Sequence, residues 1–255
     1  MSNYRELELI REHKVVKSNL IIQKSRHQWT LQQQKAMAYI ISMLKPDQEE
    51  FDWMVFDIFE FCKVCGINTS GKNYKDLKAT LLGLSNRGFW LELEDGEEIT
   101  VRWIHRAKIS PNSGLVNIKI DEYLKPFLLE LQNKFTIYQL RYMLIMSSQY
   151  SSRLYELLKS YQNLEKGEVH FDLEYLKRRI GAEVYERWVD VRRKVLDIAV
   201  REINEKTDIT VSYKTKTSRK KVIGITFTIE EKTNVQELMP MWFEHSKHFD
   251  PDPRT

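Results

Sequence analysis

Residues 55–67 read VFDIFEFCKVCGI, and residues 170–182 read HFDLEYLKRRIGA. In both stretches a Phe-Asp pair precedes a short amphipathic run, and a glycine follows ten residues after the phenylalanine. An aspartate before a helical run satisfies free backbone N–H groups, and a glycine after it commonly ends a helix. The chain therefore contains the same short-helix unit twice.

The similarity continues on the C-terminal side of both stretches. Residues 72–88 and 185–203 both have the apolar spacing of a long helix, and a shift of 114 residues matches them. The matched pairs are Tyr74 and Trp188, Asp76 and Asp190, Leu77 and Val191, Leu81 and Val195, Leu84 and Ile198, and Arg87 and Arg201.

Each long helix is followed by two segments of β character. In the first half these are residues 89–93 and 99–109, joined by the turn EDGEE; in the second half they are residues 208–214 and 222–229, joined by TKTSRK. A helix, a short helix, a long helix and a β-hairpin in this order predict a winged-helix unit. We therefore expect an α+β fold with two tandem winged-helix domains related by an internal repeat.

The expected domains are residues 1–132, residues 133–232 and a disordered tail of residues 233–255. Within them, polar capping patterns predict helix starts at Thr30, with Gln33 completing a capping box, and at Thr136, with Gln139. The tail contains LMPMWF at residues 238–243, which is apolar enough to be a docking segment for a partner.

The composition excludes several classes of protein. Apolar residues make up 42% of the chain and aromatic residues 11%, which is sufficient for folded cores. No apolar run approaches the roughly 18 residues of a membrane span, and the N-terminal residues do not form a signal-peptide core. We expect a cytoplasmic protein with no membrane partner.

The net charge of +4 is small, but its distribution is uneven. In the second half, cations gather at the end of the short helix, on the long helix and in the all-basic hairpin turn. The candidate DNA-binding residues there are Lys177, Arg178, Arg179, Arg187, Arg192, Arg193, Lys194, Arg201, Lys214, Lys216, Arg219, Lys220 and Lys221. A helix seated by its apolar face and flanked by a basic wing suits contact with a DNA groove and its phosphates.

The first half differs in the charge of its expected wing. Its long helix carries the cations Lys72, Lys75 and Lys78, whereas the turn EDGEE is acidic and would be repelled by phosphates. We expect this half to make auxiliary DNA contacts through its helix and to mediate dimerisation. The β segment of residues 99–109 could pair edge to edge with a second copy.

The sequence contains little that indicates a catalytic site or a metal site. Cys62 and Cys65 form a lone C-x-x-C that a reduced helix face also produces, and His245 and His248 lie in the tail. A rolling-circle initiator would need clustered histidines beside a nucleophilic tyrosine, and none is present. We predict no catalytic residue, no metal and no cofactor.

Three segments of the sequence resemble a known protein family. Residues 14–44, the segment of residues 135–161 and the run S-x-x-S-x-R-L-Y-E-L-L resemble the Rep_3 family of iteron-binding plasmid replication initiators over roughly residues 14–230. The run comprises Ser148, Ser151, Arg153, Leu154, Tyr155, Glu156, Leu157 and Leu158.

The resemblance implies a role in starting replication rather than in catalysis. It implies that the second winged helix binds double-stranded DNA at direct repeats (iterons) in a plasmid origin, with Arg187–Arg201 as the base-reading helix and Lys214–Lys221 as the wing. It further implies a homodimer in equilibrium with a monomer, repression of the protein's own gene at an operator by the dimer, and recruitment of host initiator, helicase and helicase loader. One alternative stays open, a winged-helix transcriptional repressor without a replication role. An adaptor that uses winged helices for protein contacts would not need the all-basic second wing.

Overall fold

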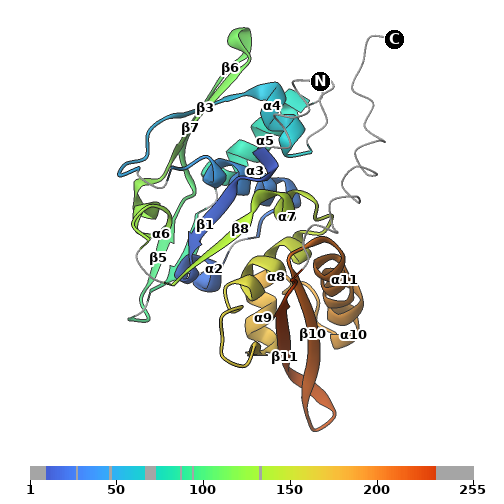
Figure 1. Cartoon of the computed structure of the whole chain (residues 1–255). Helices are drawn as coiled ribbons and strands as arrows, with labels where there is room; N and C mark the ends of the chain where they lie inside the picture. The colour runs from blue at the N-terminus through green and yellow to red at the C-terminus, as the bar shows by residue number, and fades with distance from the viewer. Residues whose placement is uncertain are drawn as a thin grey trace, which may run out of the picture.

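The computed structural model describes residues 10–26, 28–45, 48–66, 73–86, 88–93, 95–131 and 134–233. Its N-terminal and C-terminal parts form two units that meet around helices α8 and α9 (Figure 1). The tail of residues 234–255, for which we expect disorder, lies outside the described residues.

Among the described residues, the first unit contains five strands before the β6–β7 hairpin, and β8 follows that hairpin. Its elements are β1 (Lys14–Ser18), α2 (Asn19–Lys24), β2 (Ser25–Arg26), α3 (Leu31–Ser42), β3 (Met54–Asp57), α4 (Ile58–Val64), α5 (Asn73–Asn86), β4 (Phe89–Glu92), β5 (Glu98–Val101), β6 (Ile104–Ser110), β7 (Leu115–Ile120) and α6 (Lys125–Leu128). Short 3₁₀ turns occupy Pro111–Ser113 and Glu122–Leu124. The chain then continues into β8 (Phe135–Gln139) and α7 (Leu140–Leu144).

The second unit is a compact winged helix. Its elements are α8 (Gln149–Lys159), β9 (Glu168–Asp172), α9 (Leu173–Ile180), α10 (Trp188–Val191), a π-helical turn (Arg192–Leu196), α11 (Asp197–Lys206), β10 (Ile209–Ser218) and β11 (Lys221–Glu231). The strands form one antiparallel sheet in the order β10-β11-β9.

The internal repeat is confirmed by the sheet topology. In the first unit β3 leads into α4 and pairs with β7, which pairs with β6; in the second unit β9 leads into α9 and pairs with β11, which pairs with β10. The short helices begin after Asp57 and Asp172, as predicted, and Gly181 ends α9 at a φ of 74°. Asp57 accepts the Glu60 N–H at 2.9 Å, whereas Asp172 makes no capping bond with its side chain.

The prediction for the first wing was wrong. The acidic segment does form the hairpin β4–β5, but this hairpin pairs with β2 and is inserted between the long helix and the true wing. The expected single strand of residues 99–109 breaks between Val101 and Ile104, because Trp103 turns inward and stacks on Phe89 at 5.2 Å. The topological equivalent of the β10–β11 wing is the β6–β7 hairpin.

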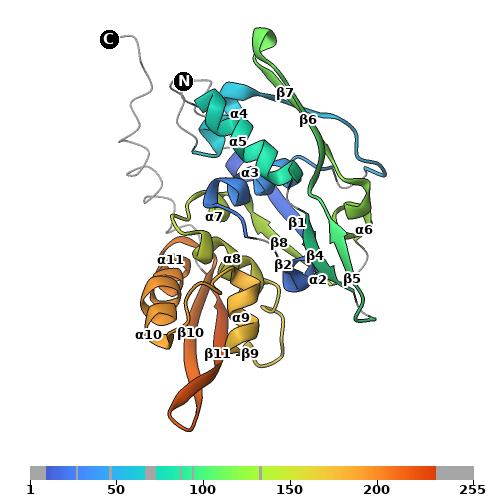
Figure 2. The same ribbon diagram turned by 180° about the vertical axis from the view of Figure 1, so that it is seen from behind.

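The two wings project from opposite ends of the molecule (Figures 1 and 2). The β6–β7 hairpin extends beyond α4 and α5, while the β10–β11 hairpin extends past α9 and α10. The two potential DNA-contacting surfaces are therefore far apart in this conformation.

One predicted helix start is confirmed and another is wrong. Thr30 and Gln33 form a reciprocal capping box at the start of α3, with bonds of 3.2 and 3.0 Å. Thr136 does not start a helix; it lies within β8, which pairs with β1 in the register Ile137 to Val16, and helix α7 begins only at Leu140.

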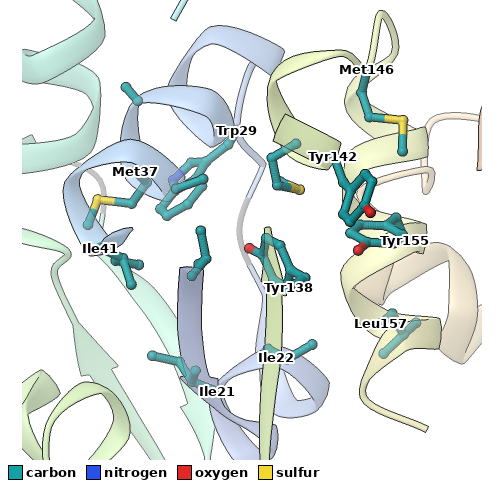
Figure 3. Close-up of a cluster of buried hydrophobic side chains, with 14 of the residues drawn as sticks. Ile21, Ile22, Trp29, Met37, Ile41, Tyr138, Tyr142, Met146, Tyr155 and Leu157 are labelled. Carbon is teal, nitrogen blue, oxygen red and sulfur yellow. The ribbon is translucent and has the colours of Figure 1, made fainter. Parts of the chain in front are cut away.

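The core is continuous from α3 to α8. Figure 3 shows Trp29, Met37 and Ile41 on one side of the β1–β8 pair, and Tyr142 and Tyr155 on the side of α7 and α8. Tyr138 meets the ring of Tyr155 edge-on at 5.5 Å. The expected domain boundary between residues 132 and 133 falls just before β8, so a strand on its C-terminal side completes a sheet with β1.

Candidate nucleic-acid interface

The long helix of the second unit contacts its own domain with one side and carries cations on the other. Val191, Val195, Leu196, Ala199 and Ile203 are buried, which confirms the apolar side expected from the sequence. The exposed side carries all five cations proposed on this helix: Arg187, Arg192, Arg193, Lys194 and Arg201. This is the arrangement that a groove-binding helix requires.

A π-helical turn interrupts this helix where its cations are densest. Such turns are rare and often occur at functional sites, since they insert an extra residue and change the direction of the side chains. Here the turn exposes Arg192, Arg193 and Lys194 together while Val195 and Leu196 remain buried. The sequence pattern alone predicts an uninterrupted α-helix.

The cations of this helix differ in their partners. Asp190 pairs with Arg187 at 2.8 Å and with Lys194 at 3.1 Å. The bond with Arg187 has the larger effect, and the two bonds together hold the pKa of Asp190 below its usual value. Arg192 lies 3.9 Å from Asp197. Among the described residues Arg193 and Arg201 have no acidic partner. These two cations are free to meet phosphates or base edges.

The wing of the second unit confirms the predicted hairpin. Strands β10 and β11 pair up to Ser218 and Lys221, so that Arg219 and Lys220 form a two-residue turn with φ values of 46° and 67°. The cations Lys214, Lys216, Arg219, Lys220 and Lys221 are all exposed, and no acid of the described chain pairs with them. Tyr213 donates to Asp197 at 3.0 Å and joins the base of the wing to the long helix.

Two of the three cations proposed on α9 do not face solvent. Lys177 is buried and pairs with Glu174 at 2.9 Å. Arg179 is 1% exposed; it donates to the Lys24 carbonyl and, at 2.8 Å, to Glu92. Of these three cations only Arg178 is exposed, whereas Lys177 and Arg179 are buried and held by partners within the protein in this conformation.

The partners of Arg179 belong to the first unit. Lys24 ends α2 and donates to Glu92 at 2.6 Å, and Glu92 ends β4 of the inserted acidic hairpin. Burial of a guanidinium between two units requires such a partner, because an unpaired buried charge is costly. The acidic hairpin therefore serves contact between the units.

Arg153 explains why the S-x-x-S-x-R-L-Y-E-L-L run is distinctive. Its buried guanidinium donates to the Arg179 carbonyl at 2.9 Å, to the Ile22 carbonyl at 2.6 Å and to the Ser25 hydroxyl at 3.1 Å. Glu156 approaches the same group at 3.6 Å and also pairs with Lys17 of β1. One side chain of α8 thus links α9 to α2 and β2.

The cations proposed on the first long helix are only partly described. Lys75 and Lys78 are exposed on α5, while Lys72 lies outside the described residues. The first wing adds cations that the sequence reasoning missed, since it assigned the wing to the acidic turn. Arg106 and Lys108 are exposed on β6, and neither pairs with an acid of the described chain.

The paired cysteines are core residues in this structure. Cys62 and Cys65 are buried free thiols of α4 and its C-terminal end, and burial raises the pKa of Cys62 to about 11. The described residues contain no group of three His, Cys, Asp or Glu side chains suited to a metal ion. His245 and His248 lie outside the described part of the chain. None of the described helices is long and apolar enough to cross a membrane.

Two family models match successive parts of the chain. Residues 14–159 match the model of the initiator replication protein WH1 domain, and residues 172–229 match that of the initiator Rep protein WH2 domain. The chain belongs to this family of replication initiators. The first match extends beyond residue 132 and includes β8 and α8, in agreement with the β1–β8 pairing.

Individual relatives support the same fold. The PI protein of Escherichia coli is 31% identical over 128 residues, a match that spans 44% of this chain and 42% of the relative. The crystal structure of Pi initiator protein in complex with iteron DNA superposes with a TM-score of 0.68 at 21% identity, covering 88% of this chain and 99% of that one. The initiator fold of two winged helices, WH1 and WH2, is therefore shown for this chain.

Proposed function

We propose that this initiator starts plasmid replication by binding directly repeated sites in double-stranded DNA, with WH2 making the principal contacts. The observation that carries the proposal is the exposed cationic surface of WH2, formed by Arg178, the long helix and the β10–β11 wing, with few acids to neutralise it. Membership of the family and the iteron complex of the Pi relative support this role over that of a plain repressor.

The geometry suggests a division of labour within WH2. The exposed arc of the long helix would enter a major groove, with Arg193 and Arg201 reaching base edges or nearby phosphates. Arg178 and the wing, from Lys214 to Lys221, would grip the backbone on either side of that groove. The charge surface is one of recognition, and we assign it no catalytic residue.

WH1 would add contacts and mediate self-association. Its exposed cations on α5 and on the β6–β7 wing, Lys75, Lys78, Arg106 and Lys108, provide a second, weaker basic surface. Strands β5 and β6 both lie at sheet edges, which suits pairing with a second copy. We propose a monomer that initiates replication and a dimer that represses the initiator's own gene, with host initiator, helicase and helicase loader engaged at the origin.

A DNase footprint on the DNA that flanks the gene tests this function. Several equal protected blocks in direct orientation, about two helical turns apart, are the expected result. A single protected inverted repeat over the promoter would support repression alone. If six to ten phosphates are neutralised, affinity should fall by about 10³–10⁵ between about 50 and 200 mM salt. No protection even at low salt would contradict both roles.

A further inference from the structure

A groove beside β8 gathers exposed apolar side chains. Phe135, Ile137 and Leu164 are 40%, 42% and 44% exposed. All three line one groove of about 650 Å³, bounded by β8, the C-terminal end of α8 and the loop that follows it. Apolar side chains gathered around a single groove indicate a contact surface.

The backbone of β8 offers hydrogen-bonding groups along the same groove. Asn19 N–H donates to the Lys134 carbonyl at 2.7 Å and Leu140 N–H donates to the His13 carbonyl at 2.8 Å, so the even-numbered residues of β8 face β1. In an antiparallel pair the alternate residues face the other way. The N–H and C=O groups of Phe135 and Ile137 therefore point to the open edge, and no described strand pairs with it.

The chain itself leads out of this groove. Glu231, the last residue of β11, lines it, and the apolar segment LMPMWF begins seven residues later at Leu238. We propose that Leu238–Phe243 occupies the groove as an added strand on the open edge of β8. An extended peptide covers up to about 3.3–3.6 Å per residue, so the connection from Thr233 to Leu238 can span up to about 18 Å.

The single proline of the segment determines which of its residues can form backbone hydrogen bonds with β8. Pro240 has no N–H group and fits an edge strand only where its backbone points away from its neighbour. The backbones of Met239 and Met241 then face β8, and their side chains lie on the same face as Phe135 and Ile137. Thioethers beside an aromatic ring are favourable partners.

Charge complements the apolar match. Lys134 lines the groove and has no acidic partner among the described residues, while Lys159 at the other rim is held by Asp208 at 2.6 Å. The segment is flanked by Glu237 and Glu244, either of which could pair with Lys134.

Hydrogen exchange of the full chain tests the proposal. The amides of Phe135 and Ile137 should be protected, and the double substitution Met239→Asp with Met241→Asp should speed their exchange at least about tenfold. The matched control is Ser246→Asp with His248→Asp, which adds the same charge outside the segment and should leave exchange unchanged. Equal exchange rates in all three proteins would overturn the proposal.

A reciprocal experiment starts from the groove. Ile137→Asp should release the segment and accelerate chymotryptic cleavage after Trp242 and Phe243 by about fivefold or more, because a paired strand is a poor protease substrate. Leu82→Asp, at an exposed apolar position of α5, is the control and should not change the cleavage. Protection of β8 that rises with protein concentration would identify a second copy as the occupant and would also overturn the proposal.

Discussion

At the scale of single residues, Arg193 stands out from its neighbours because no acid of the described chain neutralises it, whereas Arg187, Arg192 and Lys194 all have carboxylate partners. An unpaired guanidinium can form a bidentate contact with a guanine edge without first breaking an ion pair. We predict that Arg193→Ala relaxes the preference at one base position and costs about 1–3 kcal/mol there.

The measurement is a binding series over a protected site in which each base pair is changed in turn. Lys220→Ala provides the comparison, since a contact to phosphate weakens binding to every sequence alike. If Arg193→Ala weakened all sequences to the same extent, Arg193 would be a phosphate contact and not a base contact.

Glu202 is a second residue whose role depends on charge. It is buried, accepts the Ser147 and Ser148 N–H groups at 3.1 and 3.2 Å, and pairs with Lys206 at 2.8 Å. Although burial by itself would raise its pKa, the bonds with Lys206 and Ser147 outweigh this and lower the pKa of Glu202 to about 2. The ionised form therefore holds α11 to the start of α8.

A lowered pKa stabilises the fold at neutral pH. The contribution is fully present above the pKa of an unfolded glutamate, near 4.3, and is lost as the pH falls towards about 2. We predict that Glu202→Gln lowers the free energy of unfolding by about 2–3 kcal/mol at pH 7 and by much less near pH 2. Urea unfolding at both pH values measures this; Glu205→Gln, at an exposed position of the same helix, should have little effect.

At the scale of elements, the turn of the second wing combines strain with charge. Lys220 has a φ of 67°, in the left-handed region that favours glycine. We predict that Lys220→Gly leaves the free energy of unfolding unchanged or raises it by up to about 1 kcal/mol. DNA binding should weaken, and the slope of the logarithm of the binding constant against the logarithm of the salt concentration should become shallower by about 1. This result would indicate that Lys220 occupies a position better suited to glycine because its charge contributes to DNA binding.

Thermal unfolding and salt-dependent binding together measure this prediction. Lys45→Ala, which removes an exposed cation of the first unit far along the chain from both wings, is the control for net charge. A fall in stability with unchanged DNA binding would mean that Lys220 serves the hairpin and not the DNA.

The elements differ in how far local sequence predicts them. Phe56–Gly66 and Phe171–Gly181 carry their own caps and stops, so both short helices and the repeat are predictable. The stretch of residues 135–139 reads FTIYQ, whose alternating pattern competes with the T-x-x-Q capping pattern. The strand forms because β1, more than 110 residues earlier, supplies its hydrogen-bonding partner, which no local pattern reveals.

At the scale of the whole molecule, long-range partners decided which predicted site residues are available. The basic surface of the long helix and wing follows from residues close in sequence and was predictable. The burial of Arg179 depends on Glu92, which lies 87 residues away and in the other unit. A long-range partner also explains why the first wing was assigned incorrectly. The β4–β5 hairpin can be recognised as an insertion only once its pairing with β2 is known.

The contact between Arg179 and Glu92 therefore joins the two units, and its loss should change the molecule as a whole. Glu92→Ala would leave the buried guanidinium without an acid, and we predict a loss of about 1–3 kcal/mol in the free energy of unfolding, discounted because Glu92 is partly exposed. The radius of gyration measured by small-angle scattering should rise as the units separate.

Two further variants separate this effect from a general loss of charge. Adding Arg179→Met to Glu92→Ala removes the stranded charge and should recover part of the stability, since an apolar replacement of a buried pair is often tolerated. Glu97→Ala, in the exposed turn of the same hairpin, should change neither quantity. If the double variant were less stable than Glu92→Ala, Arg179 would stabilise the units mainly through the Lys24 carbonyl, and the ion pair would be secondary.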